Sequence, residues 1–112
     1  MKAGYDATRR LLTENPDVTA VMALSDTIAI GAMRALADMG KSIPEDVSVT
    51  GFDGIEMTGY CIPRLTTIKQ NTEIMASRSV DIILKHINYT AVAEHEIVPY
   101  SLIEGESVKS IR

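Results

Sequence analysis

Short apolar segments alternate with amphipathic segments along this chain, and this alternation constrains the fold more than any other feature. Residues 18–24 (VTAVMAL) and 47–52 (VSVTGF) are short, apolar and rich in β-branched side chains, which is typical of strands covered on both faces. Between them, residues 26–39 carry an apolar stripe at helical spacing. A strand, a helix and a second strand in this order predict an α/β fold with a parallel sheet.

Two further helices flank this unit. Residues 4–15 have apolar side chains at helical spacing, and the helix is expected to end before Pro16, because the residue that precedes a proline is disfavoured in helical conformation. Residues 71–88 have the clearest stripe, with apolar side chains at intervals of three and four. We therefore predict helices over both ranges.

Two shorter segments complete the predicted sheet. Residues 65–68 (LTTI) favour a strand, and residues 96–103 contain an edge strand, since Pro99 cannot donate a hydrogen bond from a central position. These elements predict a partial doubly wound, mostly parallel sheet with flanking helices. A complete sheet of this class would need a preceding strand, so we expect a fragment of a larger protein.

Composition excludes several classes of protein. The 112 residues carry a net charge of -4, so the positive charge that drives nonspecific phosphate binding is absent, and the segment is not expected to bind DNA alone. The longest apolar run, residues 18–24, is far shorter than the roughly 20 residues that span a bilayer. The first residues do not resemble a signal peptide, and the single cysteine cannot form an internal disulfide.

Polar residues follow two of the predicted strands. Ser25 and Asp26 come after the first, and Asp53 ends the second. Ligands of parallel sheets bind beyond the carboxyl ends of the strands, so these side chains are candidate ligand contacts. The alternative is structural: Ser25 or Asp26 caps a helix, and Asp53 forms a turn with Gly54.

Nothing in the sequence indicates catalysis, a metal or a cofactor. Acid–base or metal chemistry at the sheet edge would need a third partner, and none is evident. His86 and His95 lie away from the predicted edge and are expected at the surface, while Cys61 has no basic neighbour in sequence and is expected to pack. We therefore predict that the chain is not an enzyme.

The helix predicted over residues 26–39 is rich in glycine and alanine around much of its circumference, which allows close approach on more than one side. One side would meet the sheet. The other could meet a second subunit, with Met57, Tyr60 and Ile62 adding an apolar patch. Packing of all these residues within the chain is the alternative.

Three motifs, read together and in order, resemble the LacI/GalR family of bacterial transcription regulators. They are SDTIAIGAMRAL (residues 25–36), IPEDVSVTGFD (43–53) and PRLTTIKQ (63–70). The resemblance implies the C-terminal part of a two-lobed, periplasmic-binding-protein-like effector domain. It assigns residues 1–69 and 96–108 to the C-terminal lobe, and residues 70–92 to a helix that packs on the N-terminal lobe in the family. In this chain we expect that helix to fold back, swap between chains or stay loose.

The resemblance also implies roles for individual residues. Asp53 matches a ligand-binding carboxylate, Ser25 matches a ligand-contacting position that is often Asn, and Gln70 matches a weaker contact. Asp26 is expected to be chiefly a helix cap and a residue of the strand edge. The residues that match the family's dimer surface are Ile30, Met33, Arg34, Ala37, Met57, Tyr60, Cys61 and Ile62. Ser25 is shorter than the usual Asn, and Gly105 stands where many members carry Arg, so the identity of the ligand stays open.

The implied protein is a cytoplasmic homodimer that senses a small molecule, with a sugar or sugar derivative as the leading candidate. It would contact DNA only through a helix-turn-helix domain outside these residues. Because one lobe would be missing, we expect the isolated chain to bind effector weakly or not at all. The alternative is a fragment of a periplasmic sugar-binding protein, which would share the fold and Asp53.

Overall fold

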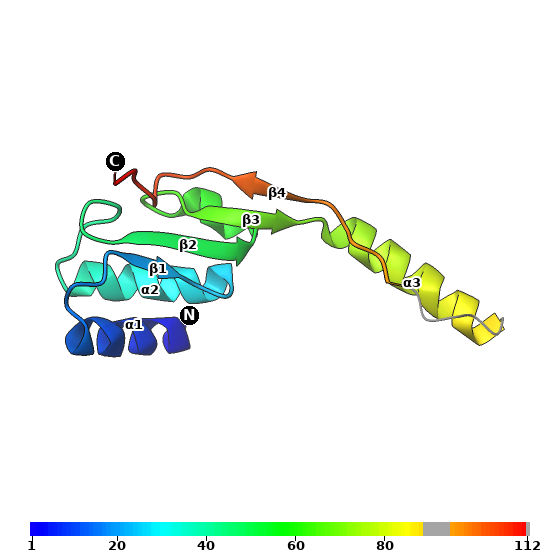
Figure 1. Cartoon of the computed structure of the whole chain (residues 1–112), viewed down its shortest axis with the longest axis horizontal. Helices are drawn as coiled ribbons and strands as arrows, with labels where there is room; N and C mark the ends of the chain where they lie inside the picture. Colours follow the sequence, from blue (N-terminus) through cyan, green and yellow to red (C-terminus); the bar gives the residue numbers. More distant parts are fainter. Residues whose placement is uncertain (89–94, 112) are drawn as a thin grey trace.

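The computed structural model describes residues 1–88 and 95–111, which are built around a four-stranded sheet (Figure 1). The strands lie in the order β1 (Ala20–Met22), β2 (Ser48–Asp53), β3 (Thr66–Gln70) and β4 (Tyr100–Ile103). The first three are parallel, and β4 pairs antiparallel with β3 at the edge. This arrangement confirms the predicted mostly parallel sheet.

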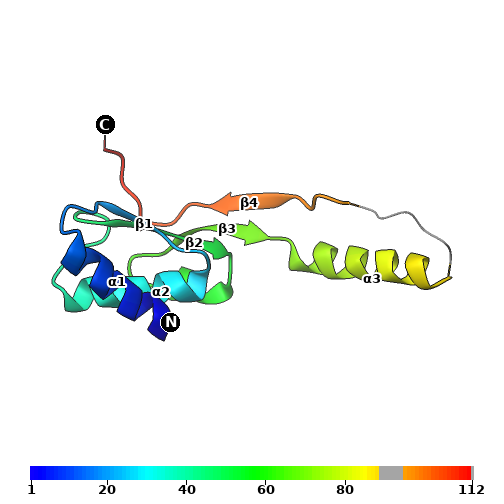
Figure 2. The same ribbon diagram turned by 60° about the horizontal axis from the view of Figure 1, so that its bottom comes forward.

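Two helices, α1 (Lys2–Glu14) and α2 (Asp26–Asp38), lie on one face of this sheet, with α2 next to the strands (Figures 1 and 2). A short 3-10 helix, η1 (Glu56–Tyr60), lies between β2 and β3 in the chain. On the opposite face Met22 and Leu24 are each 85% exposed. The prediction that the first strand is covered on both faces is therefore wrong for the described residues, because α1 and α2 cover the same side.

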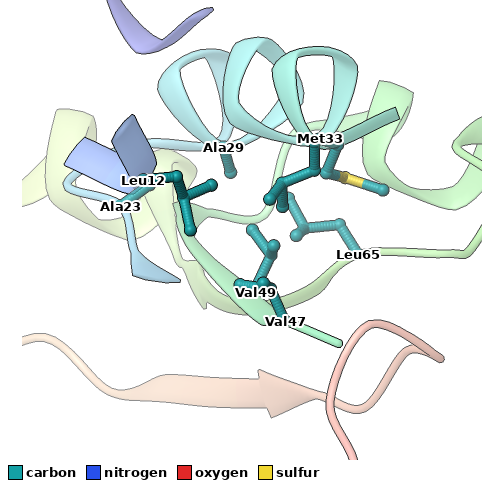
Figure 3. Packing of buried hydrophobic residues seen from close by; sticks show 8 residues of the cluster. Leu12, Ala23, Ala29, Met33, Val47, Val49 and Leu65 are labelled. Atoms are coloured by element: carbon teal, nitrogen blue, oxygen red, sulfur yellow. The ribbon is translucent and has the colours of Figure 1, made fainter. Parts of the chain in front are cut away.

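The core lies between α2 and the covered face of the sheet (Figure 3). Its most completely buried large side chains include Leu36 of α2 and Val49 of β2. The whole cluster comprises Leu12, Ala23, Ala29, Met33, Leu36, Val47, Val49 and Leu65. Burying these side chains is the main favourable contribution to this fold.

Most of the small residues of α2 are buried within the chain. A Cβ atom at Gly31 would overlap the Met1 carbonyl, and one at Gly4 would overlap the Ile28 carbonyl, so the two glycines let the backbones approach. Ala32 and Ala35 are also buried. The small-residue pattern thus reflects packing between α1 and the sheet, and it does not by itself indicate a second subunit.

Ser107, which is fully buried, connects the C-terminal tail (residues 104–111) to the sheet by hydrogen bonds. Its hydroxyl donates to the Val49 carbonyl at 2.6 Å and accepts from the Thr66 amide at 2.9 Å. One side chain therefore joins β2, β3 and the tail.

The last helix, α3 (Thr72–Asn88), projects away from the sheet and has no buried residue (Figures 1 and 2). Its apolar stripe is open to solvent, with Val80, Ile83, Leu84 and Ile87 all at least half exposed. Part of the predicted 70–92 segment, residues 89–92, lies outside the described residues. Among the helices of residues 1–88 and 95–111, none has the length and apolar character to cross a membrane.

Candidate ligand-binding edge

The parallel strands bring the three predicted ligand residues to one edge of the sheet. Asp53 is the last residue of β2, Gln70 is the last residue of β3, and Ser25 follows the end of β1. The pairing of Asp53 with Lys69 places the ends of β2 and β3 side by side. This is the carboxyl-terminal edge at which open parallel sheets bind ligands.

Asp53 and Gln70 contact each other directly. The Gln70 Nε2 amide donates to Asp53 Oδ1 at 2.8 Å, and both side chains are partly buried. Within residues 1–88 and 95–111, this is the only hydrogen bond of the Asp53 side chain. The other carboxylate oxygen and the Gln70 carbonyl oxygen therefore remain able to accept hydrogen bonds from a ligand.

The backbone at Asp53 is strained. Its φ angle is 122°, in a region that residues with a side chain rarely adopt. The next residue, Gly54, has a φ of 73°, and a Cβ atom there would lie 2.6 Å from the Lys69 Cα atom. Such strain tends to occur at functional sites, so the turn favours a binding role for Asp53 over a purely structural one.

Ser25 is the N-cap of α2. Its Oγ atom accepts from the Ile28 amide at 3.3 Å and lies 3.1 Å from Thr27 Oγ1. The capping interpretation of Ser25 is confirmed, and its ligand contact stays a prediction.

Asp26 does not cap the helix, contrary to the expectation from the sequence. It lies at the first helical position and is fully buried, and its carboxylate accepts hydrogen bonds from Thr67 Oγ1 at 2.5 Å and from the Ile55 amide at 2.8 Å. The sequence did not indicate these hydrogen bonds, because Thr67 and Ile55 are distant from Asp26 in sequence. Gly51, a glycine inside a predicted strand, was the available signal, since such glycines often mark close approach of another group.

Two hollows adjoin Gln70. One, of about 480 Å³, lies between the β3–α3 junction and the residues that lead into β4, including Asn71 and Tyr100. The other, of about 390 Å³, is lined mainly by apolar side chains such as Phe52 and Ile68. The edge therefore combines hydrogen-bond acceptors with apolar surface, as small-molecule sites do.

The residues predicted to form a dimer surface differ in their exposure. Met57, Tyr60 and Ile62 are 51%, 78% and 97% exposed, and Arg34 and Ala37 are also exposed. Ile30 and Cys61 are half-buried. Met33 is only 7% exposed and belongs to the core cluster. Met33 thus contributes to the core of the chain, and its place in a dimer surface stays a prediction.

Cys61, which follows η1, lies within the electrostatic influence of Asp26. Burial raises the pKa of the Cys61 thiol above its usual value, and the negative charge of Asp26 adds to the increase.

His86 and His95 are exposed, as expected. In the described part of the chain no cluster of three potential metal ligands occurs.

Comparison with known proteins gives consistent matches. Residues 1–108 match the periplasmic binding protein-like domain model. The HTH-type transcriptional regulator MalR of Clostridium butyricum is 37% identical over 107 residues, which are 96% of this chain and 32% of that protein. The chain thus spans about a third of the length of this curated relative.

Solved structures agree with these matches. A crystal structure of the Lac repressor dimer bound to operator and the anti-inducer ONPF superposes with a TM-score of 0.88 and 34% identity, covering 97% of this chain and 38% of that one. A LacI family regulator from Enterococcus faecium with bound ribose gives a TM-score of 0.84 and 35% identity, covering 99% of this chain and 41% of that one. The fold described above therefore matches about two-fifths of each of these regulators, 38% and 41% of their chains.

Proposed function

Because this chain belongs to the periplasmic binding protein-like family, in its LacI/GalR branch, we propose that it is the effector-sensing and dimer-forming part of a bacterial transcription regulator. The effector is a small molecule, and a sugar or sugar derivative is the favoured class. The chain has no catalytic role in this proposal and requires no cofactor.

The observation that carries the proposal is the Asp53–Gln70 pair at the carboxyl-terminal edge of β2 and β3. The pair offers acceptor oxygens, which suit ligands rich in hydroxyl groups. The E. faecium relative binds ribose, which supports the sugar class. Ser25 would supply a third contact through the oxygen that also caps α2.

The remaining partners follow from the same proposal. Residues 1–69 and 96–108 form one lobe, and the 70–92 segment packs on a second lobe, which would cover the exposed apolar stripe of α3. A homodimer forms through the surface that includes Met57, Tyr60 and Ile62. DNA is contacted only by a helix-turn-helix segment outside these residues, and the regulator works in the cytoplasm.

Binding of the ligand would close the cleft between the lobes and change the orientation of the lobes across the dimer. The spacing of the DNA-binding segments would change with it.

The competing function is that of a periplasmic sugar-binding protein, of which this chain would be a fragment. It is disfavoured because the relatives described above are named as transcription regulators.

A gel-shift assay tests the proposal. The full product of the gene that contains this chain is expected to retard DNA from its own upstream region, and one of a panel of sugars is expected to change that affinity. An Asp53→Ala variant should still bind the DNA and lose the response to the sugar. Failure of the full product to bind any DNA, combined with tight sugar binding, would favour the periplasmic protein.

A further inference from the structure

A carboxylate lies inside this domain without a charged partner. Asp26 is 0% exposed, and no ion pair to it occurs within residues 1–88 and 95–111. Removing a carboxylate from water is costly unless hydrogen bonds replace its hydration. Here Oδ1 accepts from Thr67 of β3, and Oδ2 accepts from the backbone amide of Ile55.

The adjacent strand is adapted to this carboxylate. A Cβ atom at Gly51 of β2 would overlap Oδ1 of Asp26 and would also press on Leu65. Any larger residue at position 51 would displace the Asp26 side chain. A glycine inside a strand weakens the strand. Its presence at position 51 therefore indicates that room for the Asp26 carboxylate at this position is important to the structure.

The hydrogen bond to Ile55 acts on the strained turn. Ile55 is two residues beyond Asp53, whose φ of 122° needs support from its surroundings. The same residue also connects to η1, because its carbonyl accepts from Thr58 Oγ1 at 2.7 Å. The Thr58 carbonyl in turn accepts from the Leu65 amide at 3.2 Å. A continuous set of hydrogen bonds thus runs from Asp26 through the turn to η1 and the start of β3.

We propose that Asp26 is a positioning residue for the effector site: by holding Ile55, it fixes the Asp53 carboxylate against Gln70 and joins the ligand edge to η1. This inference rests on the proposed function, since it takes Asp53 as a ligand contact. Because Asp26 itself is fully buried, it acts on the site through Ile55 and not by direct contact with the effector.

NMR of the side-chain amide of Gln70 tests this in the whole 112-residue chain, without any ligand. A Gln70 Nε2 group bonded to a carboxylate has proton shifts that differ from those of a free glutamine. In Asp26→Ala, we expect the Gln70 shifts to move to the free-glutamine values. Asp26→Asn should restore the parental shifts, because its Oδ1 can accept from Ile55 while its Nδ2 donates to Thr67 Oγ1.

Thr67→Val is the matched control, since it removes the second hydrogen bond of Asp26 and leaves the Ile55 bond in place. It should lower stability and keep the Gln70 signature. A merely structural Asp26 would give lower stability in Asp26→Ala with unchanged Gln70 shifts, and that result would overturn the proposal.

Amide exchange in the parental chain provides a measurement that needs no variant to fold. The Ile55 amide lies outside every helix and strand, yet we expect it to exchange slowly because Asp26 holds it. Rapid exchange at Ile55 would also overturn the proposal. Neither measurement depends on an effector, so their failure would leave the proposed function standing, and failure of the gel-shift assay would leave them unaffected.

Discussion

The Gln70 amide donates to the Asp53 carboxylate across 2.8 Å and joins the last residues of two adjacent parallel strands. The contact places a carboxylate and an amide at the edge where ligands of such sheets bind, on a turn whose backbone is strained.

The strain at Asp53 predicts an unusual order of stability for substitutions. Asp53→Gly and Asp53→Ala both lose the Gln70 hydrogen bond, but only glycine adopts a φ of 122° freely. Relief of backbone strain of about 1–3 kcal/mol, less a glycine entropy cost of about 0.5–1 kcal/mol, should leave Asp53→Gly the more stable variant. Urea unfolding measures the difference. An Asp53→Ala variant more stable than Asp53→Gly would show that the turn is not strained.

The hydroxyl of Ser107 is predicted to contribute strongly to the free energy of unfolding. Ser107→Ala leaves the Val49 carbonyl and the Thr66 amide each without the Ser107 hydroxyl as a partner, in a buried place. We expect a loss of about 1–3 kcal/mol in the free energy of unfolding. Ser101→Ala, at an exposed position of β4, is the control and should stay within about 0.5 kcal/mol of the parent. Equal effects of the two substitutions would refute the role assigned to Ser107.

The sequence predicted the helices and strands better than it predicted the contacts between them, and the reasons are physical. The helices and strands were predicted because each has its own hydrophobic period. Asp53 was expected at the sheet edge because parallel strands end at a common edge, whereas its neighbour Gln70 was named only through the family resemblance. The uncovered sheet face was not predicted, since periodicity reports that a segment can be buried and does not report what covers it. Asp26 was misassigned as a cap because its partners, Ile55 and Thr67, come near only after the sheet forms.

The predicted dimer surface can be tested at Ile62, which is 97% exposed. Ile62→Asp should weaken the dimer by about 2 kcal/mol or more, because a charge would replace an apolar contact at the interface. Sedimentation equilibrium of the full regulator measures this. Ile97→Asp changes another exposed isoleucine, 80% exposed and outside the predicted surface, and should leave the dimer intact. Loss of dimerisation in Ile97→Asp with none in Ile62→Asp would place the interface elsewhere.

The Arg64–Glu106 pair predicts a pH dependence. The Arg64 backbone amide and guanidinium bond to Glu106 and hold the pKa of its carboxyl below the usual 4.5. A lowered pKa means that the carboxylate stabilises the fold above pH 4.5 and loses this contribution as the pH falls through its folded-state pKa.

Urea unfolding of the parent and of Glu106→Gln at several pH values checks this sign. The parent should be the more stable protein at neutral pH, and the difference should shrink in acid. The pair is exposed, so we expect a small effect. Glu104→Gln, which removes an exposed carboxylate with no ion pair in the described part of the chain, is the control. A difference between parent and Glu106→Gln that is constant with pH would contradict the assignment.

This domain is proposed to sense an effector within a transcription regulator, and the in-frame sequence of the source DNA upstream of Met1 tests that role most directly. A helix-turn-helix segment followed by a second periplasmic-binding-protein-like lobe is the predicted result. A signal peptide followed by such a lobe would contradict the claim and assign the chain to an exported binding protein.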